Sequence, residues 1–196
     1  MVAAALALPA CTRSVPAAKA AAANTAAETC LPGERGYLRA SLRGAIDSDL
    51  DWRGAAVQCE GGARPDARGL RVSFAGPADA RGGRLRLVFG IAARPGAGKN
   101  RNAPTNVTLI VEGQRRLYAT QGDDKCTVEA LVQEPLPAAS TLPTGGARPY
   151  RVAARGYCID PATALDGTER LYVNRFDFAG LARFDDNDLH GTITQD

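Results

Sequence analysis

The chain has 196 residues, of which 24 are Lys or Arg and 21 are Asp or Glu, so its formal net charge is +3. This length is enough for one sizeable domain with its own hydrophobic core. Because the basic residues are spread along the sequence rather than clustered, the charge pattern argues against a nucleic-acid-binding protein.

The first ten residues, MVAAALALPA, are apolar and end directly before Cys11. This segment is about half as long as a helix that crosses a bilayer, and its small residues are typical of the end of a secretory signal. Leu8-Pro9-Ala10-Cys11 resembles the lipobox of bacterial lipoproteins, which implies that Cys11 is lipidated and becomes the mature N-terminus. We therefore expect residues 1–10 to be a truncated signal segment. The alternative is cleavage after Ala5-Leu6-Ala7, which would release a soluble periplasmic protein.

An Ala-rich, unpatterned stretch follows, and residues 11–29 are expected to be a tether. Treated as a flexible coil, about 18 residues reach roughly 25 Å, which would hold a domain clear of the lipid headgroups. Thr12 is unlike an inner-membrane retention signal. The resemblance thus implies a periplasmic protein, anchored to the outer membrane by lipid.

Five cysteines in one chain favour an oxidising compartment, and their odd number leaves one without an intramolecular partner. Cys11 stands apart from the others. Cys30, Cys59, Cys126 and Cys158 allow three pairings, and their positions favour Cys126 with Cys158 and Cys30 with Cys59. Each bridge is expected to stabilise the domain by about 2–4 kcal/mol. The spacing contains no C-x2-C pair, so no metal site and no cofactor are expected.

From residue 36 onward, apolar and polar residues alternate with a period of two, the pattern of half-buried strands. The segments with this pattern are 37–46, 69–74, 84–91, 106–111, 126–132, 150–158 and 169–180. Glu112-Gly113-Gln114 separates two strand-like runs, so residues 106–120 are predicted to be a hairpin. Asp160 followed by Pro161 resembles a helix start, which predicts at most one short helix near 161–166.

Many short strands with one polar face are typical of an antiparallel fold. We therefore predict an all-β domain over residues 30–196, an antiparallel β-sandwich or flattened barrel of about eight to ten strands. The stretches QCEGGARPDARGLRVSFAG and RFDFAGL resemble segments of uncharacterised bacterial periplasmic proteins across residues 36–184. That resemblance implies a β-rich fold and carries no activity.

Three aspartates, Asp47, Asp49 and Asp51, match the opening of a calcium-binding loop. Trp52 then occupies the position where such a loop needs glycine, so a solvated strand face is the favoured interpretation. DDND at 185–188 is a second acidic cluster. Trp52 itself is a candidate platform for a ligand such as a sugar, although a core position is more usual for a lone tryptophan.

PGAGKNR resembles a phosphate-binding loop but lacks the required first glycine and final hydroxyl residue. Residues 92–105 are instead predicted to be a long loop between two strands. Because Arg94, Lys99 and Arg101 lie among Gly, Pro and Asn, this loop is the candidate for an anionic contact.

The sole histidine, His190, lies in a polar tail, so a nucleophile–histidine catalyst is not expected. The sequence favours a non-catalytic binding or structural module that presents loops to a glycan, a lipid headgroup or a protein. The alternatives are a carboxylate-based hydrolase of envelope polymers and a calcium-dependent, lectin-like domain. The hydrolase requires two carboxylates facing each other across a pocket, and the lectin requires the acidic clusters beside a concavity.

Overall fold

The computed structural model describes residues 30–80, 82–137, 146–165 and 167–190. Cys11 and the expected tether, 11–29, lie outside these residues, as does the predicted signal segment. The elements in chain order are η1 (Pro32–Glu34), β1 (Tyr37–Gly44), β2 (Ser48–Arg53), η2 (Gly54–Ala56), β3 (Gln58–Ala63), β4 (Leu70–Ala78), β5 (Arg84–Ile91), β6 (Lys99–Asn100), β7 (Ala103–Glu112), β8 (Arg116–Ala119), β9 (Cys126–Pro135), β10 (Arg148–Cys158), β11 (Ala162–Ala164), β12 (Arg170–Phe184) and α1 (Asp186–His190).

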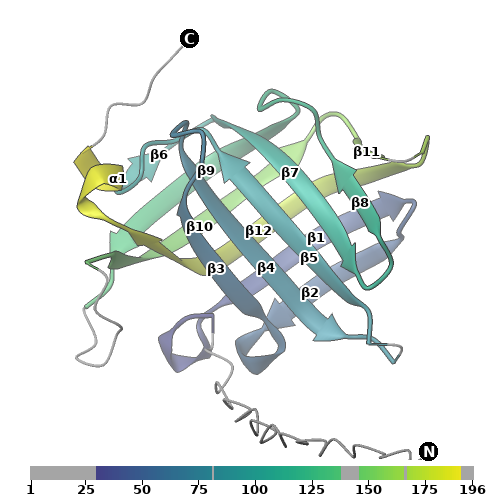
Figure 1. Ribbon diagram of the computed structural model, residues 1–196, viewed down its shortest axis with the longest axis horizontal. Coiled ribbons are helices and arrows are strands. Elements are labelled where there is room, and N and C mark those ends of the chain that lie inside the picture. The colour runs from purple at the N-terminus through teal and green to yellow at the C-terminus, as the bar shows by residue number, and fades with distance from the viewer. Residues whose placement is uncertain (1–29, 81, 138–145, 166, 191–196) are drawn as a thin grey trace, which may run out of the picture.

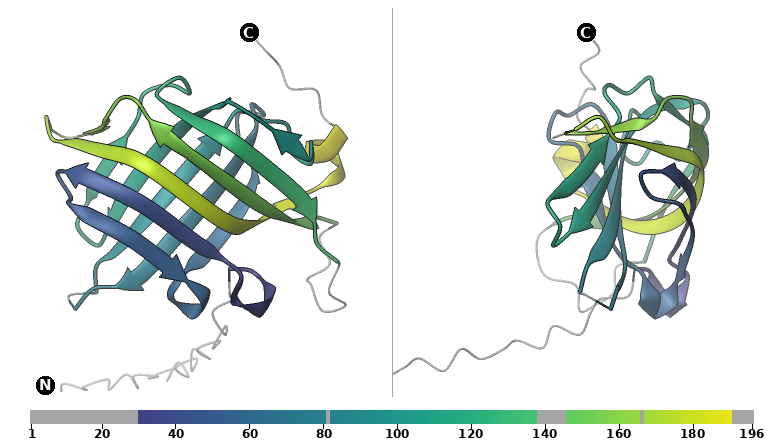
Figure 2. Two further views of the ribbon diagram at one scale, coloured as in Figure 1. Left: turned by 180° about the vertical axis from the view of Figure 1, so that it is seen from behind. Right: turned by 90° about the vertical axis from the view of Figure 1, so that its right-hand side faces the viewer.

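The strands form two antiparallel layers that are joined at their sides (Figure 1). The front layer contains β3, β4, β5, β7 and β8, and the back layer contains β2, β1, β12, β10, β9 and β6. Pairing of β7 with β9, and of β11 with both β8 and β12, links the layers. The right view of Figure 2 shows the layers facing each other. The predicted all-β sandwich or flattened barrel is confirmed.

The long strand β12 organises the back layer. Its first part pairs with β1, and its second part pairs with β10, so the same strand curves through the whole layer. The described residues contain twelve strands rather than the predicted eight to ten. The difference includes β6 and β11, which have two and three residues and are too short to show a periodic pattern.

Apolar side chains from both layers meet in one core. Phe178 of β12 lies 4.9 Å from Phe74 of β4 and 4.7 Å from Phe89 of β5, measured between ring centroids. Phe176 contacts the same Phe89 ring at 4.8 Å. All four rings are buried, and each comes from the apolar face of an alternating strand. Aromatic contacts between the layers therefore hold the sandwich together.

The predicted helix near 161–166 is wrong. Its described part contains β11, which pairs with β8 on one side and with β12 on the other. A helix of about six residues would satisfy few backbone groups internally, whereas these two strand edges offer partners. The short helix α1 lies in the polar tail instead, where Asp185 accepts from the backbone N–H of Asp188 at 2.8 Å and caps the helix start.

The four cysteines of the domain form Cys30–Cys59 and Cys126–Cys158, the pairing that the sequence favours. Two disulfides in one small domain indicate an oxidising, non-cytoplasmic compartment. Within the described part of the chain, none of the helices has the length and apolar character needed to span a bilayer.

Candidate functional site

A groove of about 820 Å³ crosses the outer face of the back layer, the face toward the viewer in the left view of Figure 2. Its walls come from β1, β2, β9, β10 and β12. The lining residues are Arg39, Ala40, Ser41, Asp49, Leu50, Glu129, Arg155, Gly156, Tyr157, Asn174, Arg175, Phe176 and Asp177. Most of these side chains are polar, because the apolar side of each strand faces the core. We call this feature the outer groove.

Two β-bulges shape the outer groove. On β12, Arg175 pairs with Ser41 and Val173 pairs with Leu42, so Asn174 is an extra residue. On β9, Ala130 and Val128 pair with consecutive residues of β10, so Glu129 is an extra residue there. A bulge bends its strand and redirects side chains, and bulges are frequent beside functional sites. As a result, Asn174 and Arg175 are both exposed on the same side of β12.

Gly156 of β10 lies between these two bulges and faces Phe176 of β12. A Cβ atom at this position would come within 2.1 Å of the Thr127 carbonyl oxygen and 2.7 Å of the Phe176 ring. The close approach of β9, β10 and β12 at the floor of the outer groove therefore requires glycine.

Two carboxylates in the groove are already bound by the protein. Arg43 contacts both oxygens of Asp49 at 2.9 Å, and this hydrogen bond, helped by one from Ser41, lowers the pKa of Asp49. The hydroxyl of Tyr37 donates to Asp177 at 2.9 Å, and Arg39 lies 4.0 Å from the other oxygen of Asp177. Burial and the bond to Asp177 raise the pKa of Tyr37, so this phenol remains a donor at neutral pH.

Other polar groups of the groove are unengaged. Within the described residues, the guanidinium groups of Arg155 and Arg175 have no hydrogen-bond or ion-pair partner, and neither do the side chains of Glu129 and Asn174. All four residues are exposed, and Tyr157 beside them is 37% exposed. The outer groove therefore offers donors, one acceptor-only carboxylate and an aromatic ring to a ligand from outside the domain.

Trp52, the predicted ligand platform, is a core residue. It is only 9% exposed and packs within the main hydrophobic cluster. A Cβ atom at Gly76 of β4 would lie 2.3 Å from the indole ring, so the backbone of the facing layer covers the ring. The alternation of β2 thus directs Trp52 into the core with Leu50, and a small part of Trp52 lines a pocket of about 380 Å³.

The three aspartates of the calcium-loop pattern are held separately. Asp47 accepts the backbone N–H of Gly44 at 3.0 Å, Asp49 binds Arg43, and Asp51 binds Arg53 at 2.6 Å. Asp51 has a lowered pKa for that reason. Within the described residues, no group of three or more His, Cys, Asp and Glu side chains is arranged to hold a metal ion. In the 185–188 cluster, Asp185 and Asp188 bind each other's backbone N–H groups.

Much of the segment 92–105 pairs with neighbouring strands and does not form one long loop. Residues 99–100 form β6 against β9, and β7 already begins at Ala103. The buried Gln133 accepts the N–H of Gly96 and donates to the carbonyl of Arg94, which fixes the remaining turn. The predicted long loop is therefore wrong in extent, because Gln133 and the β9 edge satisfy its backbone groups.

The three cations of that segment do not form part of the outer groove. Arg94 donates to the carbonyl of Leu189 at 2.9 Å and lies beside His190 in a smaller pocket near α1. Lys99 and Arg101 are exposed. Lys99 and Arg101, at the β6 edge, have no hydrogen-bond or ion-pair partner in the described part of the chain, so they remain candidates for an anionic contact.

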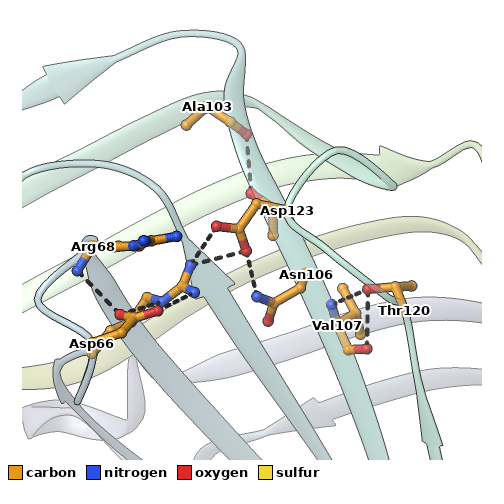
Figure 3. Close-up of polar contacts among 9 residues, drawn as sticks. Asp66, Arg68, Ala103, Asn106, Val107, Thr120 and Asp123 are labelled. Carbon is orange, nitrogen blue, oxygen red and sulfur yellow. Dashed lines mark hydrogen bonds and ion pairs between the residues drawn. The ribbon is translucent and has the colours of Figure 1, made fainter. Parts of the chain in front are cut away.

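A further polar cluster ties loops of the front layer together (Figure 3). Arg64 binds both oxygens of Asp123 at 3.0 and 2.9 Å and both oxygens of Asp66 at 3.1 and 2.7 Å. Asn106 donates to the same Asp123. Although burial opposes ionisation of Asp66, hydrogen bonds from Arg68 and Arg64 lower its pKa. These groups satisfy one another, so the cluster has a structural role.

The sequence reasoning did not identify the outer groove, although its residues lie on the polar faces of predicted strands. Comparison with protein-family models, with curated proteins and with solved structures gave no match in any of the three. Inference about function therefore depends on the groove itself.

Proposed function

We propose that the chain is a non-catalytic binding module of the bacterial envelope, which holds a saccharide chain in the outer groove. One observation carries this proposal: polar side chains that have no partner among the described residues line a groove whose backbone is fixed by paired strands. Sites on rigid scaffolds bind without a large ordering cost. The oxidising compartment indicated by the disulfides agrees with an envelope location.

A saccharide fits the chemistry of the outer groove. Sugar hydroxyls both donate and accept hydrogen bonds, and Asn174, Glu129 and the two free arginines offer the complementary groups. The exposed ring of Tyr157 offers an apolar surface next to these groups, as a sugar ring needs on one face. A purely apolar ligand would leave these polar groups desolvated and unpaired.

Binding is favoured over hydrolysis by the state of the carboxylates. Carboxylate-based hydrolysis of glycans needs one protonated carboxyl group as the acid. The pKa of Asp49 is lowered by Arg43, which makes this residue a poor proton donor, and Asp177 accepts a hydrogen bond from the Tyr37 hydroxyl. Among the described residues, Glu129 alone of the groove carboxylates has no protein partner, so the groove offers no pair of free carboxylates for the acid and base roles.

The two exposed tyrosines of the back layer provide a matched test. Tyr157 lines the outer groove, whereas Tyr172 lies on β12 outside it and is 42% exposed. The full chain carrying Cys11→Ser should bind to an array of bacterial envelope saccharides. Tyr157→Ala in that chain should weaken the binding about tenfold, or ~1.4 kcal/mol. Tyr172→Ala should bind as the parent does. Absence of binding to every saccharide, or equal loss in both variants, contradicts the proposal.

We also propose that Cys11 carries the lipid that anchors the domain to the outer membrane. The support is the lipobox-like Leu8-Pro9-Ala10-Cys11 and the pairing of the other four cysteines, which leaves Cys11 over. When the chain is exported from a host with a lipoprotein signal sequence ahead of Cys11, Cys11→Ser should move the protein from the detergent-extracted membrane fraction to the soluble periplasm. Unchanged fractionation, together with an intact mass that lacks acyl chains in the parent, contradicts the anchor.

A further inference from the structure

We infer that the saccharide held in the outer groove is acidic, and that Arg155 and Arg175 together bind its carboxylate. This inference rests on the proposed function and specifies the class of ligand. Its starting point is that two guanidinium groups in one groove have no protein partner among the described residues.

Arg155 lacks a partner although a carboxylate lies opposite it. The register of β10 and β12 places Arg155 directly across from Asp177. In most sheets such a pair would form a cross-strand ion pair. Here the Tyr37 hydroxyl donates to one oxygen of Asp177, and Arg39 lies 4.0 Å from the other. The neighbouring strand β1 therefore competes for the carboxylate and leaves the positive charge of Arg155 available.

Arg175 is available for a different reason. It lies at the β12 bulge, where it pairs with Ser41 of β1 rather than with an acidic residue. Asp49 of β2 lies beyond Ser41 in the same register, and Arg43 binds both of its oxygens. Because Arg43 rather than Arg175 takes this carboxylate, the charge of Arg175 also faces the groove unneutralised.

The two arginines are placed to act on one anion. Arg175 is two residues from Asp177, the residue that faces Arg155, so the two arginines are diagonal neighbours on adjacent strands. Diagonal neighbours in a sheet are about 7–8 Å apart, which two long side chains can span. Guanidinium groups bind carboxylates and phosphates through two parallel N–H···O bonds, more strongly than neutral donors do.

Glu129 limits the charge that the groove can accept. Its carboxylate lies on the other bulge, has no protein partner among the described residues and lines the same groove. A densely charged polyanion would be repelled by Glu129, whereas a sugar with one carboxylate could place a hydroxyl there as a donor. The arrangement favours a uronic acid over a highly phosphorylated chain.

Calorimetric titration of the full chain carrying Cys11→Ser can test this inference with matched saccharides. The probes are glucose and galactose oligomers in which a single residue is replaced by glucuronate or galacturonate, the same oligomers without that carboxylate, and the same oligomers with a single 6-phosphate in its place. Arg155→Gln/Arg175→Gln should weaken binding of the preferred uronate oligomer about 100-fold, through the loss of two charged contacts. Binding of the neutral counterpart should change little. Arg115→Gln/Arg170→Gln, which removes the same charge outside the groove, should bind like the parent.

The outcomes separate the inference from the proposed function. Equal binding of neutral and uronate oligomers, unaffected by the double variant, overturns the inference and leaves the saccharide site in place. Binding of none of these saccharides contradicts both. Tighter binding of the sugar phosphates assigns the arginines to phosphate and overturns the carboxylate assignment. The triple variant Arg94→Ser/Lys99→Ser/Arg101→Ser provides the last outcome. If it loses uronate binding while Arg155→Gln/Arg175→Gln keeps it, the anion contact lies at the β6 edge and the inference is overturned.

Discussion

Removal of the Cys126–Cys158 bridge should lower the free energy of unfolding by about 2–5 kcal/mol, as expected for a native disulfide of a small exported domain. The two cysteines face each other directly at the ends of β9 and β10, and Cys126 is buried in the main core. The bridge also lies next to Tyr157, so it fixes one wall of the outer groove. Denaturant unfolding of Cys126→Ala/Cys158→Ala, followed by circular dichroism, measures the loss.

The matched control is Cys30→Ala/Cys59→Ala, because its bridge closes a loop of similar length, with separations of 29 and 32 residues. The chain-entropy contribution of the two bridges is then almost equal. We expect the Cys126–Cys158 variant to lose more, since its bridge joins strands that form the groove wall. A larger loss in the control, or no shift of the unfolding midpoint in either variant, contradicts this expectation.

Phe178→Ala should lower the free energy of unfolding by about 3–5 kcal/mol. The Phe178 ring is fully buried and contacts Phe74 and Phe89 of the facing layer, so its removal leaves a cavity between the layers. Chemical denaturation provides the measurement.

Tyr172→Ala is the control on the same strand, because this side chain is 42% exposed and faces solvent. Surface changes of this kind usually stay within about 0.5 kcal/mol. If Phe178→Ala lowered the free energy of unfolding less than Tyr172→Ala does, the packing of the two layers on each other would be contradicted.

Much of the fold is encoded in local alternation. β1, β7 and β10 alternate between buried and more exposed residues over most of their length, and the predicted hairpin 106–120 lies in β7 and β8. β3 has no such pattern, since its sequence QCEGGA contains two glycines. Gly61 is needed there because a Cβ atom would come within 2.8 Å of the Arg71 carbonyl and 2.9 Å of the Leu181 carbonyl. The requirement for glycine at this position comes from contacts with other strands, so the neighbouring sequence contains no pattern that predicts it.

The outer groove could not be predicted from the sequence as fully as the fold. Arg39 and Ser41, Arg155 and Tyr157, and Arg175 and Asp177 are recognisable as polar faces of strands. Which strands are neighbours depends on long-range pairing, and the bulges at Asn174 and Glu129 exist only as register shifts between partners. Trp52 is more conspicuous in the sequence than any residue of the groove, because it is the sole tryptophan. It occupies a core position, which is the usual place for a lone tryptophan.

Backbone amide chemical-shift mapping can show directly whether the saccharide binds in the outer groove. The ¹⁵N-labelled full chain carrying Cys11→Ser would be titrated with the tightest-binding saccharide of the array. The largest shifts are expected in the groove strands, at residues 155–157 of β10, 174–177 of β12 and 39–41 of β1. Largest shifts at 94–101 beside α1, or at the core residues around Trp52, would contradict the assignment of the outer groove as the binding site.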